Sequence, residues 1–232
     1  MLQIKVPFLK PSELDHASAE LLRKYSGWKC APSRPPIDVD EIAEGMLGLD
    51  LEVVDLKQHL KMNDVLGATW LDDGRICIDE SIEGQEGRFA FTVAHELGHW
   101  QLHRPIIEMD KVTLPLFAAK PGDKPAPAIV CRAQARKQPA EWQADQFAAR
   151  LLMPASDVIA AMRALHGDEP PVLAGLDAAR EARQLTSALR TIAAGVISGG
   201  NFTNVSNEAM CYRLLDLKLV LDQAAARQGR LL

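Results

Sequence analysis

Two histidines and a glutamate stand together in His95-Glu96-Leu97-Gly98-His99, a spacing that suits metal chemistry. On a helix, residues four positions apart lie about 40° apart around the axis, so His95 and His99 can hold one ion from the same face. Zinc accepts imidazole ligands and lowers the pKa of bound water to roughly 7. Glu96 lies beside them and can take a proton from that water and pass it to a leaving amine. The motif therefore predicts zinc-dependent hydrolysis.

A catalytic zinc site needs a third protein ligand and one open position. Glu141, at the start of the next strongly helical segment, is our candidate. Asp145 lies one turn further on the same face, where its carboxylate can accept the free ring N–H of a ligand histidine and fix its tautomer. The residues alone leave a second interpretation equally open, in which a solvated acidic helix start favours the helix dipole.

Regular elements are expected to position these residues. Apolar side chains at helical spacing predict a helix over residues 85–103 that packs one side on the core. Before it, alternating segments and the Asp73-Gly74 turn predict a small, largely antiparallel sheet. Trp70 and its strand are a candidate sheet edge for an extended substrate, with a plain core strand as the alternative. Helical patterns return after Pro154, so the fold class is α+β.

Longer stretches of sequence resemble a known family. The HExxH segment is followed by Leu102-His103 and by the block 141–154, and a further similarity lies in 205–217. Together they resemble the ImmA/IrrE family of metallopeptidases over about residues 20–220.

The resemblance implies a zincin-like core, in which an antiparallel-rich sheet lies over two metal-binding helices, with His95 and His99 on one helix and Glu141 on the next. We accordingly expect a zincin-like metallopeptidase domain over residues 1–154, with an irregular Pro-rich insertion over 104–138, and a C-terminal helical region over 155–232. The resemblance also implies a substrate: a helix-turn-helix-type repressor, cleaved to relieve repression of stress-response or mobile-element genes.

Three residues are weaker candidates for contacts with the transition state or the substrate. His103 follows His99 by one turn, although a histidine favoured by the helix dipole at a helix end is the alternative. Tyr212 and Arg213 lie on a predicted C-terminal helix that could cap the cleft and supply a donor to the developing oxyanion. For these two the alternative is packing and a surface ion pair.

Charge and cysteine content argue against several classes of binding partner and metal site. The chain has 232 residues and a net charge of −5, so no overall basic field recruits nucleic acid or an anionic membrane. Four scattered cysteines form no CxxC pair, which argues against a cysteine zinc site and favours a reducing compartment. With no signal peptide pattern and no stretch of eighteen apolar residues, we expect a cytoplasmic protein.

Three functions compete at this point. The first is a zinc endopeptidase that cleaves a repressor, and the second is a metal-dependent hydrolase of other peptides or amides. The third is a non-catalytic helical binding module with a structural metal, although such a site does not need Glu96. Manganese could occupy the same ligands, since selectivity depends on geometry and availability more than on raw affinity.

Overall fold

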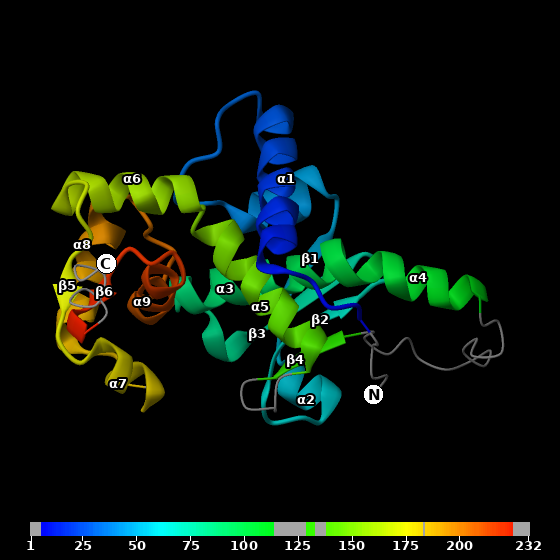
Figure 1. The fold of residues 1–232 in the computed structure, drawn as a ribbon. Helices are drawn as coiled ribbons and strands as arrows, with labels where there is room; N and C mark the ends of the chain where they lie inside the picture. Colours follow the sequence, from blue (N-terminus) through cyan, green and yellow to red (C-terminus); the bar gives the residue numbers. More distant parts are fainter. Residues whose placement is uncertain (1–5, 114–128, 133–137, 183, 225–232) are drawn as a thin grey trace. The chain divides into compact units, whose positions relative to one another are not determined.

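The computed structural model describes residues 6–113, 129–132, 138–182 and 184–224, of which the side chains of 110–113, 129–132 and 180 are not described. The chain forms two compact units, the first of residues 1–33 and 38–151 and the second of residues 34–37 and 152–232. The first unit combines helices with a sheet and the second is mainly helical (Figure 1). The chain is therefore α+β, as predicted. The domain boundary at residue 154 stays a prediction.

The first unit contains a sheet, and its helices come from segments before, within and after the strands in sequence (Figure 1). In chain order the elements are α1 (Pro11–Lys29), η1 (Glu41–Met46), β1 (Asp50–Val54), α2 (Leu56–Leu60), β2 (Val65–Trp70), β3 (Arg75–Asp79), η2 (Glu80–Ile82), α3 (Glu86–Gly98), η3 (His99–His103), α4 (Arg104–Thr113), β4 (Ile129–Arg132) and α5 (Pro139–Leu152).

The sheet of this unit has four strands among the described residues, in the order β1-β3-β2-β4. β2 and β3 form the predicted hairpin, in whose turn Gly74 takes a φ of 64°. β1 pairs with β3 in parallel, and β4 pairs with β2 antiparallel. Of the two interpretations of the Trp70 strand, the sheet edge is wrong and the core strand is observed, because β4 pairs with β2 on the side away from β3. A strand so distant in sequence could not be placed from local patterns.

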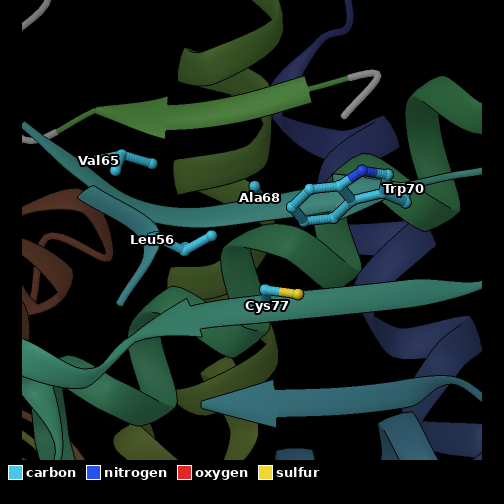
Figure 2. Packing of buried hydrophobic residues seen from close by; sticks show 5 residues of the cluster. All are labelled: Leu56, Val65, Ala68, Trp70 and Cys77. Atoms are coloured by element: carbon cyan, nitrogen blue, oxygen red, sulfur yellow. The ribbon is translucent and has the colours of Figure 1, made fainter. Parts of the chain in front are cut away.

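The two faces of β2 have different partners. One face carries an apolar cluster whose members are all at most 3% exposed. The cluster comprises Leu56, Val65, Ala68, Trp70 and Cys77 (Figure 2). A bulge between Val65 and Gly67 shifts the alternation of side chains. Gly67 and Thr69 therefore lie on the opposite face, where they contact α3. One face of the sheet therefore packs in this apolar cluster, and the other face contacts the helix that carries the candidate site.

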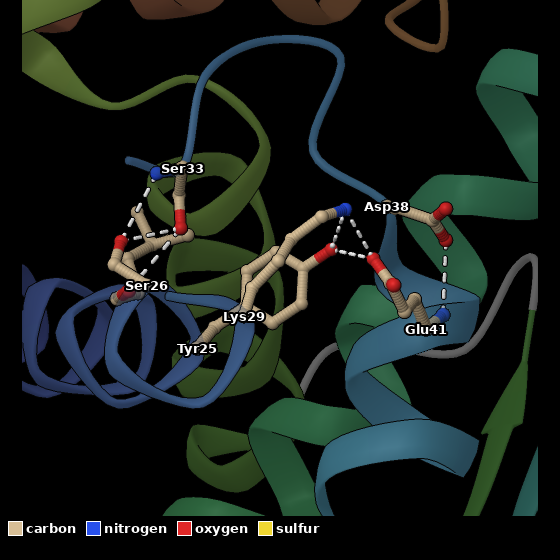
Figure 3. A network of polar contacts seen from close by, with 7 residues as sticks. Tyr25, Ser26, Lys29, Ser33, Asp38 and Glu41 are labelled. Carbon is tan, nitrogen blue, oxygen red and sulfur yellow. Dashed lines mark hydrogen bonds and ion pairs between the residues drawn. The ribbon is translucent and has the colours of Figure 1, made fainter. Parts of the chain in front are cut away.

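Polar contacts fix the N-terminal helix to its neighbours. The hydroxyl of Tyr25 donates to Glu41, and Lys29 Nζ donates to the same carboxylate at 2.6 Å. Figure 3 shows these side chains joining α1 to η1. At the other end of α1, Arg150 Nε on α5 donates to Asp15 at 2.7 Å. Helix α1 is therefore held to η1 and to α5, one of the two helices that carry the site.

The predicted helix over residues 85–103 is present, but it does not stop there. The irregular insertion expected over residues 104–138 is wrong at its start, because α4 continues the helix through Pro105. The N–H of Arg104 bonds to the carbonyl of His99, five residues back, so a π-helical turn comes directly before the proline. Such a wider turn accommodates a proline that lacks an N–H and crowds the preceding turn. Residues 114–128 and 133–137 of the expected insertion lie outside the described residues.

The second unit is a set of helices with one short parallel strand pair. Its elements are α6 (Ala155–His166), β5 (Val172–Leu173), α7 (Leu176–Glu181), α8 (Ser187–Gly199), α9 (Asn207–Asp216) and β6 (Leu221–Asp222). Asn201 and Asn204 donate to the carbonyls of Pro35 and Ile37, which ties the 34–37 segment to this unit. Among the helices of the described residues, none is long and apolar enough to cross a membrane.

Candidate metal centre

Helix α3 carries the HExxH motif into the interior of the first unit. Every residue from Thr92 to Gly98 is buried, so the helix is enclosed over its last two turns. His95 is 2% exposed, and Glu96 and His99 are fully buried. Burying three polar side chains on one helix is costly unless each finds partners. Their partners therefore define what the site can do.

Glu141 at the start of α5 meets both histidines. Its two carboxylate oxygens each lie 3.3 Å from one Nε2, Oε2 from that of His95 and Oε1 from that of His99. The approach of the two helices depends on Gly98, because a Cβ there would lie 3.1 Å from the Cα of Ala144 on α5. Glycine in the fourth position of the motif therefore lets α5 come close enough for Glu141 to reach the histidines.

The donor atoms of these three residues form a set that fits a cation. One ligand atom from each of His95, His99 and Glu141 lies within 4.8 Å of the others. His95 Nδ1 is 3.0 Å from Asp145 Oδ1, and because an ionised carboxylate only accepts, that ring nitrogen carries the hydrogen. In the neutral ring, the lone pair on His95 Nε2 then faces His99 Nε2 at 2.9 Å and the Glu141 carboxylate. A metal ion bound among these acceptors satisfies all of them at once.

Glu96 is held next to this group without joining it. The hydroxyl of Thr69 on β2 donates to Glu96 Oε2 at 2.6 Å. The other oxygen, Oε1, has no hydrogen-bond partner within the described part of the chain although it is buried. Gly67 makes room for it, since a Cβ at that position would lie 2.6 Å from Oε1. A buried carboxylate oxygen without a partner is a feature expected of a group that awaits a substrate or a water.

The comparison with protein families agrees with this geometry. The model of the peptidase M78 family, described as the IrrE N-terminal-like domain, matches residues 49–184, which is more than half of the chain. The chain belongs to the peptidase M78 family. The resemblance to ImmA/IrrE peptidases is thereby confirmed, and the match includes the HExxH motif and Glu141. Residues 20–48 and 185–220, over which the resemblance also extends, lie outside the match. No curated protein matches the sequence significantly.

Burial shifts the pKa values of the residues in the candidate metal site. It raises the pKa of Glu96 to about 7, although nearby His95 and the Thr69 hydroxyl act in the opposite direction. Burial also lowers the pKa of His99 to about 4 despite its contact with Glu141. For Glu141 burial acts to raise the pKa, but His95 and His99 outweigh it and hold the value well below normal. The site therefore combines a neutral imidazole at His99, an ionised carboxylate at Glu141 and, at Glu96, a carboxylate close to its protonation point at neutral pH.

The remaining predicted residues lie in different surroundings. Asp145 contacts His95 in the position expected for a supporting carboxylate. His103 is fully buried behind His99, with its ring nitrogens at His99 and Gln143, so no substrate contact follows from this arrangement. Arg213 in the second unit is buried and its Nε donates to the carbonyl of Met153, whereas Tyr212 is 44% exposed. Contacts of Tyr212 and Arg213 with a transition state stay predictions.

Sequence reasoning missed three residues of the M78 site. Gly67 and Thr69 lie two positions apart on β2, a spacing that places both on one face of a strand. Gln143 lies two positions after Glu141 and is only 2% exposed. A buried glutamine on a helix that carries a predicted ligand is the signal that could have found it. For Gly67 and Thr69 no such signal exists, because their contact with Glu96 spans the strand-to-helix connection.

Proposed function

We propose that the chain is a zinc-dependent endopeptidase with a zincin-like core. The observation that carries this proposal is the convergence of His95 Nε2 and His99 Nε2, both on buried side chains, with the partly exposed carboxylate of Glu141. Membership of a peptidase family supports the same reaction class. These three residues would hold the metal, and Asp145 would orient His95 from behind.

Glu96 is the general base in this proposal. When bound, zinc supplies a Lewis acid for the scissile carbonyl and for the attacking water. Glu96 Oε1 accepts the proton of that water and returns it to the leaving amine, while Thr69 holds Oε2 in place.

For the substrate we propose a helix-turn-helix-type repressor, whose cleavage relieves repression of stress-response or mobile-element genes. This part rests on the family resemblance alone. A net charge of −5 supports a protein substrate over direct binding of nucleic acid. Manganese in place of zinc would use the same three ligands.

The proposal is tested by metal content and cleavage together. Wild-type protein should carry about one zinc per chain by mass spectrometry, and His99→Ala and Glu141→Ala should lose it on dialysis. Glu96→Gln should keep the metal and lose cleavage of a helix-turn-helix-type repressor by roughly a hundredfold to ten-thousandfold.

Glu86→Gln is the matched control, because Glu86 lies on the same helix but is exposed. It should retain full activity. Undiminished cleavage by Glu96→Gln would refute the mechanism, and full zinc content in Glu141→Ala would reject Glu141 as a ligand. Cleavage of short peptides in place of the repressor would support a less selective hydrolase. An absence of metal in the wild type would favour a binding module.

A further inference from the structure

A row of buried polar groups extends behind His99, away from the three candidate ligand atoms. His99 Nδ1 lies 2.8 Å from His103 Nδ1, and His103 Nε2 lies 3.0 Å from Gln143 Oε1. Gln143 Nε2 in turn donates to the backbone carbonyl of Pro7 at 2.7 Å. His99 and His103 are fully buried and Gln143 is 2% exposed. The row joins η3, α5 and the segment before α1.

The carbonyl at the far end sets the direction of every hydrogen bond in the row. The oxygen of Pro7 can only accept, so the amide nitrogen of Gln143 faces it and Gln143 Oε1 faces His103. An amide oxygen also only accepts, so His103 carries its hydrogen on Nε2 and accepts at Nδ1. His99 must then carry its hydrogen on Nδ1. Its Nε2 lone pair is left facing His95 and Glu141.

We propose that His103 and Gln143 are positioning residues that fix the tautomer and ring orientation of His99, with the backbone of Pro7 as the fixed end of this relay. The inference rests on the metal site of the proposed function, since it assigns the Nε2 lone pair of His99 to that site. It makes the main-chain carbonyl of Pro7, before α1, a part of the metal centre.

The two histidines are therefore supported in different ways. His95 has a carboxylate behind it, at 3.0 Å, whereas His99 has a chain of neutral groups that ends on the main chain. A second carboxylate at this depth would add a buried negative charge beside Glu96 and Glu141. A neutral relay gives the same control of the tautomer without that charge. If the relay only satisfied buried polar groups, its loss would lower stability and leave metal affinity unchanged.

The first test needs no variant. Nitrogen-15 NMR of the histidine rings, recorded on the metal-free full-length protein, distinguishes a hydrogen on Nδ1 from one on Nε2. We expect the hydrogen of His99 on Nδ1 and that of His103 on Nε2. The opposite assignment for either ring would overturn the relay. Because the measurement uses no metal and no substrate, its result is separate from success or failure of the proposed peptidase activity.

The second test measures zinc affinity by competition with a chelator. Gln143→Met keeps the length of the side chain and removes both hydrogen bonds, and should weaken zinc binding about tenfold. Gln146→Met is the matched control on the same helix, because Gln146 accepts from Arg150 and not from a histidine. It should leave zinc affinity unchanged.

Equal zinc affinity in Gln143→Met and wild type would overturn the positioning role. In the Gln143→Met protein the ring NMR should also show His103 distributed between both tautomers, which a purely structural role would not produce. If that variant does not fold, the tautomers of the wild-type protein still decide the proposal.

Discussion

The two units of the chain bury polar groups for different purposes. In the second unit, the buried side chains of Arg213 and Asp222 form hydrogen bonds with the backbone: Arg213 donates to the carbonyl of Met153, and Asp222 accepts from two N–H groups at the start of α7. In the first unit, His95, His99 and Glu96 are buried among other titratable side chains. In the second unit these buried side chains satisfy backbone groups. In the first unit the buried side chains form the candidate metal site.

This difference predicts where stability and function can be separated. A buried charge that bonds to the backbone stabilises the fold, and its removal leaves a carbonyl or an N–H without a partner. Buried groups that face one another for the sake of a ligand oppose folding until the ligand binds. Substitution of Arg213 or Asp222 should therefore lower stability without changing metal affinity, and variants around the metal centre should change function together with the pH dependence of stability.

The largest effect is expected in the pH dependence of the metal-free protein. His99 has a folded pKa of about 4 against 6.5 unfolded, so its contribution makes stability rise with pH across that range. Glu96, with a folded pKa of about 7 against 4.5, contributes the opposite slope. Glu96→Gln removes the second contribution. Between pH 4.5 and 6.5 its stability should therefore rise more steeply than that of the wild type, by roughly 2 to 3 kcal/mol in total.

The measurement is urea unfolding of both metal-free proteins at several pH values, followed by tryptophan fluorescence. All four tryptophans lie in the first unit, so the signal reports on the unit that contains the site. Parallel stability curves for the two proteins would contradict the assignment of a buried, proton-binding Glu96.

A smaller effect is expected in the second unit. Arg213→Met keeps the aliphatic part of the side chain but leaves the carbonyl of Met153 without this donor, and should lower the free energy of unfolding by about 2 kcal/mol. The loss should be visible in far-ultraviolet circular dichroism. Zinc affinity should not change. A lower zinc affinity in Arg213→Met would show that the buried polar groups of the second unit affect the metal centre.

The smallest effect is expected at Thr69. Thr69→Val removes the hydroxyl that helps to lower the pKa of Glu96, so the acidic limb of the cleavage profile should move to higher pH. Thr92→Val is the control, because the Thr92 hydroxyl bonds to the backbone carbonyl of Arg88. An unshifted profile in Thr69→Val would mean that the hydroxyl does not act on the general base.

The sequence predicts those parts of the site that depend on local spacing. The 95–99 motif and the Asp73-Gly74 hairpin follow from residue spacing within a short segment. For Glu141 and Asp145 the spacing left a solvated helix start equally open, and the family resemblance favoured the ligand role. The parts that could not be predicted depend on contacts between distant segments. β4 beside β2, Thr69 beneath Glu96 and Gln143 against Pro7 each join segments separated by tens of residues or more.

The continuation of the helix through Pro105 was missed for a different reason. Proline ends most helices, and the rule holds when the preceding turns are α-helical. Here the turn from His99 to His103 is π-helical, and no local pattern in those five residues predicts a π-helical turn.

That turn also has a consequence for how the sequence can change. A π-helical turn holds one residue more than an α-helical turn, so it is equivalent to a single-residue insertion absorbed without unwinding the helix. Deleting Gln101 would remove this extra residue and return the segment to α-helical geometry, in which His103 follows His99 by three positions and stays on the same side of the helix. The metal-binding motif and the direction of α4 would be kept, but Pro105 would then crowd a turn of ordinary width. The length of this segment is therefore tied to the proline that follows it.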